Sequence, residues 1–166
     1  MSTNSVSAKS IQRSWHLVDA KNQTLGRLAG NVAKTLMGKN KVNYVPYLDM
    51  GDFVVITNAS MIKVTGRKAE QKNYYNHSGY PGGLRTRSFT TVLATNPQEI
   101  LKRAIKGMLP NNKLRSKMLK KLFVFASTDH PYKKQLKQDS VEPKTEVKEE
   151  VVAEAPAEAV KEENNG

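Results

Sequence analysis

The sequence predicts an α/β fold in which helices cover a mainly parallel sheet of about four strands. Residues 25–37 place apolar side chains three and four positions apart, which is typical of a helix that buries one face. Residues 52–58 form an apolar run rich in β-branched side chains, as expected of a strand covered on both faces. A strand at residues 15–20 precedes the helix, and this order of elements favours a right-handed crossover and a parallel pair.

The ends of the first helix carry their own signals. Thr24 follows a polar turn and is a candidate N-cap, and Gly38 stands where a residue that tolerates positive φ commonly ends a helix. Residues 61–65 then predict a short strand, and residues 73–75 predict another. Residues 76–88 are too rich in glycine and charge for the core, so we expect a loop there.

A second long helix begins at residues 96–99. An asparagine, a proline and a glutamic acid there take the N-cap, the first and the third helical positions. Apolar residues at helical spacing continue to Leu109, and Pro110 ends the pattern. Residues 114–122 predict a further short helix, and residues 123–126 predict a final strand.

Charge divides the chain into unequal parts. The 166 residues carry a net charge of +12. Residues 139–166 hold nine acidic residues and three lysines, a balance of −6, whereas the preceding 138 residues hold 24 basic and six acidic residues, a balance of +18. We therefore expect a flexible arm at residues 1–13, one α/β domain at residues 14–132 and a low-complexity, mostly acidic disordered tail at residues 133–166. So positive a body repels itself, and nucleic acid is the commonest neutralising partner.

The composition excludes several kinds of site. The chain has no cysteine, so it has neither disulfides nor thiolate-bound metals, and its three histidines (His16, His77 and His130) lie too far apart for a short metal motif. No apolar run approaches the roughly 20 residues of a membrane helix, and the first residues lack the apolar stretch of a secretory signal. We expect a soluble protein of a reducing compartment, without metal or cofactor.

Two arrangements would suit enzyme chemistry, and both have simpler explanations. Residues 24–30 bring glycines to a helix start, where backbone N–H groups can hold a phosphate, but their spacing matches neither the Rossmann nor the P-loop pattern. Close helix packing explains those glycines better. Asp49 and Asp52 offer an acid–base pair with His77 as proton carrier, but turn and capping roles explain them at least as well. We therefore expect that the protein is not an enzyme.

The strongest functional signal lies in residues 67–87, where basic side chains alternate with aromatic ones. Cations meet phosphates, aromatic rings stack on unpaired bases, and glycines let the backbone approach RNA closely. An ordinary solvated loop is the alternative. The predicted RNA-binding residues here are Arg67, Lys68, Lys72, Tyr75, His77, Tyr80, Gly82, Gly83, Arg85 and Arg87.

A second basic cluster covers residues 102–121, where no acidic residue offers an ion-pair partner. Phosphate binding is therefore favoured over a merely solvated face. A third, smaller patch follows the first helix. The predicted RNA-binding residues are Lys106, Lys113, Arg115, Lys117, Lys120 and Lys121 in the second cluster, and Lys39 and Lys41 in the third patch. Zinc-finger ligands, RNP aromatics and a KH-type clamp are lacking, which favours recognition of a folded RNA by shape and backbone.

Four segments carry a resemblance to a known family. They are WHLVDAKNQTLGRLA at 15–29, GKNKVNYVPYLDMGDFVVITNA at 38–59, VTGRKAEQKNYYNHSGYPGG at 64–83 and IKGMLPNNKLRSKMLKKLFVF at 105–125. Together they resemble the bacterial-type large-subunit ribosomal protein L-thirteen family. The resemblance implies a three-layer α/β/α domain around a mainly parallel sheet, and no catalytic site or cofactor.

The same resemblance implies a function and partners. It implies a structural constituent of the cytoplasmic large ribosomal subunit that is a monomer within the ribosome and supports translation. The implied partners are 23S-type rRNA, which the family binds early in assembly, and neighbouring ribosomal proteins. Two other hypotheses remain open from the sequence. One is a regulatory protein that binds messenger RNA when it is free of the ribosome, and the other is a small nucleotide-using enzyme built on residues 24–30.

Overall fold

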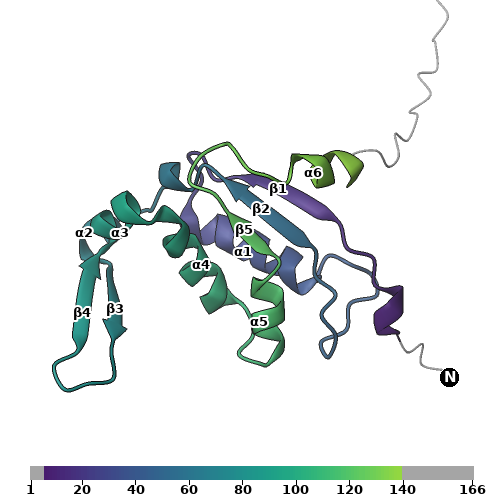
Figure 1. Ribbon diagram of the computed structural model, residues 1–166, viewed down its shortest axis with the longest axis horizontal. Helices are drawn as coiled ribbons and strands as arrows, with labels where there is room; N and C mark the ends of the chain where they lie inside the picture. Colours follow the sequence, from purple (N-terminus) through teal and green to yellow (C-terminus); the bar gives the residue numbers. More distant parts are fainter. Residues whose placement is uncertain (1–5, 140–166) are drawn as a thin grey trace, which may run out of the picture.

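The computed structural model of the chain describes residues 6–139 (Figure 1). Its strands are β1 (Trp15–Asp19), β2 (Phe53–Thr57), β3 (Asn73–His77), β4 (Leu84–Ser88) and β5 (Leu122–Val124). Its α-helices are α1 (Leu25–Met37), α2 (Lys68–Gln71), α3 (Phe89–Thr95), α4 (Pro97–Met108), α5 (Leu114–Leu119) and α6 (Lys133–Asp139). Two 3-10 helices are η1 (Ala8–Ser10) and η2 (Ala59–Met61).

The central sheet is parallel and runs in the order β1-β2-β5. Its register aligns Trp15 with Phe53 and Val54 with Leu122. The middle strand β2 is buried from its second residue to its last, as its unbroken apolar run predicted. The α/β class, the parallel pairing and the strands predicted at the two ends of the domain are therefore confirmed.

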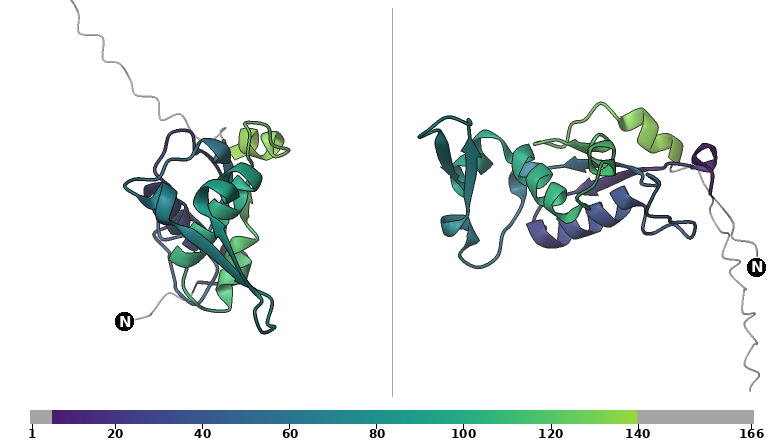
Figure 2. Two further views of the ribbon diagram at one scale, coloured as in Figure 1. Left: turned by 90° about the vertical axis from the view of Figure 1, so that its left-hand side faces the viewer. Right: turned by 90° about the horizontal axis from the view of Figure 1, so that it is seen from below.

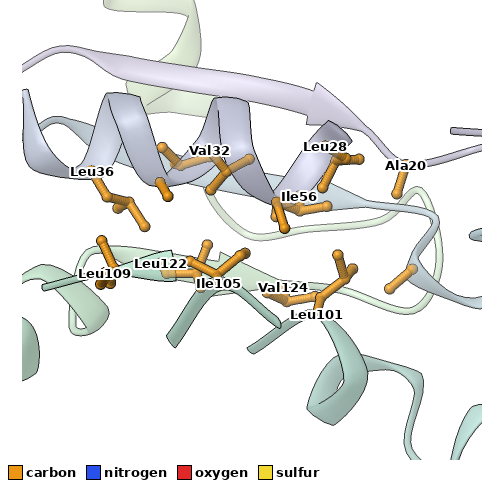
Figure 3. Close-up of a cluster of buried hydrophobic side chains, with 14 of the residues drawn as sticks. Ala20, Leu28, Val32, Leu36, Ile56, Leu101, Ile105, Leu109, Leu122 and Val124 are labelled. Atoms are coloured by element: carbon orange, nitrogen blue, oxygen red, sulfur yellow. The ribbon is translucent and has the colours of Figure 1, made fainter. Parts of the chain in front are cut away.

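Helices α1 and α4 pack together on one face of this sheet (Figure 3). Leu28, Val32 and Leu36 project from α1 toward Leu101 and Ile105 of α4, and side chains of β2 and β5 complete the cluster. Each such buried aliphatic side chain contributes about 1.5–3 kcal/mol relative to exposure. Apolar spacing therefore predicted both helices correctly, because this burial is what holds them in place.

The opposite face of the sheet carries aromatic side chains, because successive residues of a strand point to opposite sides. The ring centroid of Trp15 lies 4.5 Å from that of Phe53 and 5.2 Å from that of Tyr132, and Phe123 lies 4.4 Å from Tyr132. Tyr132 directly precedes α6, which lies beside β1 (Figure 2). This seven-residue helix is a thinner cover than a full layer, so the three-layer architecture stays a prediction.

The two ends of the domain are more regular than predicted. Residues 133–139 were predicted to be disordered, but they form α6, whose start follows the aromatic contacts of Tyr132. The predicted flexible arm contains η1, where the Ser7 hydroxyl accepts a hydrogen bond from the backbone N–H of Lys9 at 3.4 Å. The acidic remainder of the tail, from residue 140, lies outside the described residues, as do residues 1–5.

The prediction of a strand at residues 61–65 was wrong. η2 occupies its start, and only Lys63 makes an isolated parallel bridge, with Thr24. The backbone carbonyl of Lys63 accepts a hydrogen bond from the N–H of Leu25, so this segment pairs with the start of α1 instead of the sheet. Among the described residues the parallel sheet therefore has three strands and not about four.

Residues 76–88 form no loop but most of a β-hairpin that projects from the body (Figure 1). β3 and β4 pair antiparallel, with Tyr74 opposite Arg87, and Gly79 and Gly82 turn the chain with φ angles of 90° and 70°. Backbone pairing requires no apolar alternation, which explains why composition alone missed it. A small cluster of Tyr74, Phe89, Val92 and Ile100 fixes the hairpin to α3 and α4.

The segment between α1 and β2 folds back against the end of α1 through two glycines. Gly38 ends the helix with φ of 78°, as predicted. A Cβ atom on Gly51 would lie 1.7 Å from the carbonyl oxygen of Leu36, so only glycine fits there. The approach is held by the ammonium of Lys121, which donates to Asp49 Oδ1 at 2.6 Å and to the carbonyl oxygen of Gly51 at 2.7 Å.

Replacing Gly51 with alanine is expected to lower the free energy of unfolding by about 3 kcal/mol, because the new methyl group overlaps the backbone of α1. Urea denaturation monitored by Trp15 fluorescence measures the change. Gly30→Ala is the matched control, since nothing lies within 4 Å of a Cβ there and alanine favours the helix. Equal stability of the two variants would contradict the close approach.

Asp52 gives the fold a defined sensitivity to acid. Its burial acts to raise the carboxyl pKa, but hydrogen bonds from His16, Lys41 and the backbone N–H of Ser14 outweigh burial, so the pKa lies below its usual value. The Lys41 ammonium lies 2.5 Å from Asp52 Oδ1 and the His16 Nε2 lies 3.3 Å from Oδ2. The unfolded chain therefore takes up this proton more readily than the folded chain.

The stability contributed by Asp52 is expected to be fully present above the pKa of this carboxyl in the unfolded chain, about 4. It should be lost as the pH falls through the lower pKa of the folded chain. Free energies of unfolding measured between neutral and acidic pH should therefore fall less steeply for Asp52→Asn than for the unmodified chain. The same acid slope in both proteins would show that the carboxylate is not the group responsible.

Candidate nucleic-acid interface

The two strands of the hairpin place their arginines on one face and their exposed rings on the other, while the buried Tyr74 lies on the arginine face. Opposite residues of an antiparallel pair share a face, and the faces alternate along each strand. Arg87 stands opposite Tyr74, and Arg85 stands opposite Asn76, so both arginines lie on the Tyr74 face. Both are exposed. The guanidinium groups therefore form a single cationic surface, which is suited to a phosphate backbone.

The other face of the hairpin presents rings. Tyr75, which is 60% exposed, and His77 belong to it because they stand opposite Thr86 and Leu84. Tyr80 lies in the turn and is 76% exposed. Exposed rings of this kind can stack on unpaired bases.

The turn of the hairpin gives structural roles to three residues predicted to bind RNA. The Nδ1 atom of His77 accepts a hydrogen bond from the backbone N–H of Gly79 at 2.9 Å. Gly82 has φ of 70°, which favours glycine. A Cβ atom on Gly83 would lie 2.1 Å from the Ser78 hydroxyl. The geometry of the turn is therefore sufficient to explain both glycines.

The basic cluster of α4 and α5 is largely exposed. Lys106 lies in the last turn of α4, Lys113 precedes α5, and Lys117 and Lys120 lie in and directly after α5. The hairpin turn, the connection from α4 to α5 and the segment after α1 all project toward the lower edge of the molecule in Figure 1. Exposed Lys39 belongs to that last segment. In this view the three segments that carry the basic residues therefore extend toward the same side of the molecule.

Three cations predicted to bind RNA have partners within the protein. Lys121 is only 5% exposed and is held by Asp49, so its prediction as an RNA-binding residue is corrected: this ammonium is not at the surface. Burial lowers the pKa of Lys121, although Asp49 opposes the shift. Lys41 is engaged with Asp52. The Arg115 Nε donates to the carbonyl oxygen of Pro110 at 3.0 Å and thus fixes the turn after α4.

A cleft of about 630 Å³ opens beside the base of the hairpin, and we term it the basic cleft. Its walls come from the start of α1, from residues 64–74 and from α4. Its charged and aromatic side chains are Arg27, Lys68, Lys72, Tyr74 and Arg103. Of these, only Lys68 and Lys72 were predicted as site residues. Tyr74 lies within the predicted segment 67–87, Arg103 within the predicted cluster 102–121, and Arg27 within residues 24–30, which were considered for phosphate binding; only the fold brings these three segments together.

Other kinds of site receive no support from the described residues. Within residues 6–139, no three histidine, aspartate or glutamate side chains are grouped so that they could hold a metal ion. In the same range no helix combines the length and the apolar character needed to cross a bilayer. The walls of the basic cleft include neither a carboxylate nor an imidazole.

Comparison with known proteins finds relatives that match most of this chain. The relatives include the protein named large ribosomal subunit protein uL13 from Rubrobacter xylanophilus, 51% identical over 122 residues, which are 74% of this chain and 85% of the relative. The protein of the same name from Pelobacter propionicus is 50% identical over 132 residues, 80% of this chain and 93% of the relative. That of Prochlorococcus marinus is 52% identical over 129 residues, 78% of this chain and 86% of the relative.

The matched region coincides with the folded domain. The family model described as ribosomal protein L13 matches residues 13–131, which begin just before β1 and end just before α6. The match therefore contains the parallel sheet, the hairpin and the basic cleft. Together with relatives near 50% identity over most of their length, it shows that this chain belongs to the ribosomal protein L13 family.

Proposed function

We propose that this chain is a non-enzymatic structural component of the large ribosomal subunit that binds 23S-type rRNA. The observation that carries the proposal is the projecting hairpin, whose residues 73–88 contain no acidic side chain and place Arg85 and Arg87 on one exposed face. Family membership supports the partner, because its relatives are named as proteins of the large ribosomal subunit.

Binding of this kind draws its free energy mainly from phosphate neutralisation. Each cation that meets a phosphate releases condensed counterions, so affinity falls steeply with salt. The exposed rings of Tyr75 and Tyr80 add stacking on unpaired bases, worth about 1–3 kcal/mol per base. A surface that combines both contacts suits a folded RNA with unpaired nucleotides better than a uniform duplex.

The role that follows is architectural. By crossing several RNA segments along its basic edge, one copy of the chain stabilises the local rRNA fold early in subunit assembly, beside neighbouring ribosomal proteins, and thereby supports translation in the cytoplasm. No observation favours the regulatory alternative with messenger RNA.

Reversing the hairpin charge with Arg85→Glu and Arg87→Glu is expected to weaken binding to large-subunit rRNA by at least about tenfold and to reduce the salt slope by roughly 0.7–0.9 per lost phosphate contact. Filter binding over a series of salt concentrations measures both quantities. The control is Lys133→Glu with Lys134→Glu, which makes the same charge change on exposed α6 residues. If the two double variants lost affinity equally, the net charge of the protein, and not the position of the two arginines on the hairpin, would explain the binding.

The acidic segment is expected to limit nonspecific binding. Removing residues 139–166 deletes a balance of −6 and leaves the +18 body exposed to any polyanion. The truncated protein should therefore bind unrelated RNA more tightly at low salt, and the difference should shrink as salt screens the charges. Gel-shift titrations with a non-ribosomal RNA test this, and unchanged affinity at low salt would contradict it.

A further inference from the structure

We propose that the basic cleft binds one unpaired nucleotide, with its phosphate on the cations and its base against the apolar wall. The inference rests on the proposed RNA-binding function and names a ligand subsite within it. A cleft of about 630 Å³ falls within the range of about 300–1,000 Å³ that small-ligand sites occupy.

The charge of the cleft calls for an anion. Arg27, Lys68, Lys72 and Arg103 reach it from three separate elements, α1, α2 with its following residue, and α4. Glu99 pairs with Arg103 at 2.6 Å, which fixes that guanidinium but neutralises only one of the four cations. Low-dielectric walls concentrate the field of the remaining charge, so a phosphate entering the cleft would be held more strongly than at an open surface.

The remaining walls of the cleft are apolar, and a free inorganic anion would make no favourable contact with them. Leu25, Val64 and Ala104 line the cleft, together with Met108. Met108 is 44% exposed although its side chain is apolar. Tyr74 adds an aromatic ring. A ligand that satisfies both kinds of wall must carry an anionic group beside a flat apolar surface, and a nucleotide has this combination.

Tyr74 links the two halves of the cleft. Its ring centroid lies 5.3 Å from the Lys72 ammonium and 5.4 Å from the Arg103 guanidinium carbon, so two cations are held beside one ring. Burial raises the pKa of the Tyr74 hydroxyl above its usual value, so this side chain carries no negative charge that would repel a phosphate.

The cleft also continues the basic face of the hairpin. Tyr74 lies directly opposite Arg87 in the β3–β4 register, and Arg85 lies one step farther along the same face. An RNA backbone that follows the two arginines toward the body therefore reaches the cleft. This continuity favours a nucleotide of a bound RNA over a free mononucleotide, although both offer the same chemistry.

The test compares Met108→Glu with Met61→Glu, which introduces the same charge at another exposed methionine, 53% exposed and outside the cleft. Both side chains are open to solvent, and thermal unfolding verifies that both variants fold. Wild-type protein and each variant are bound to large-subunit rRNA, and 2′-hydroxyl acylation maps the protected nucleotides. In a parallel arm, adenosine monophosphate is titrated into the protein and followed by backbone amide shifts.

We expect Met108→Glu, but not Met61→Glu, to restore reactivity at one or two unpaired nucleotides while the rest of the footprint persists, with affinity lowered about tenfold. Saturable binding of adenosine monophosphate in the cleft, with an rRNA footprint that Met108→Glu leaves unchanged, would show that the cleft takes a free nucleotide and not a nucleotide of bound RNA. Failure of both arms would overturn the site itself. Failure of the proposed function differs from these outcomes, because the wild-type protein would then give no specific rRNA footprint.

Discussion

The buried ammonium of Lys121 is the contact on which the geometry of this domain depends. It stands immediately before β5 and holds Asp49 and the carbonyl oxygen of Gly51, while its own carbonyl oxygen accepts the N–H of Val54 in β2. A buried charge is stable only when it is fully paired, and removal of either partner of such a pair is typically far more damaging than loss of a surface pair. One side chain therefore joins the returning segment after α1 to the strand that completes the sheet.

Apolar patterns made the body of the fold predictable. The apolar spacing in α1 and α4 and the unbroken apolar run in β2 indicate which faces of these elements are buried. Burial of those faces is what orders the three elements. The strand predicted at residues 73–75 is confirmed as part of β3, but β4 and its pairing with β3 escaped prediction because both strands are exposed at most positions and are ordered by backbone pairing and one small cluster at the base. The role of Lys121 escaped for another reason: a sequence does not show that a lysine in a basic run meets an aspartate 72 positions away.

The residue types of the candidate interface were predictable from the sequence, but their arrangement in space was not. Basic and aromatic residue types in residues 67–87 indicate RNA, yet the division into a cationic and an aromatic face follows only from the β3–β4 register. The basic cleft needed still more, because Arg27 and Arg103 are far apart in the chain and each has a sufficient local explanation in its own helix. Sites assembled from several elements are generally invisible until the crossover connections are known.

The hairpin reaches the apolar interior only at its base, where Tyr74 packs with Phe89, Val92 and Ile100 in a small cluster that shares the partly buried Leu25 and Leu93 with the main core. Regions with few buried apolar contacts generally open at a lower free-energy cost than the core. We therefore expect the amide hydrogens of β3 and β4 to exchange with solvent faster than those of β2, which lies between two strands. An arm fixed only at its base can change its angle to the body at little cost in buried contacts, while the sheet beneath it keeps its shape.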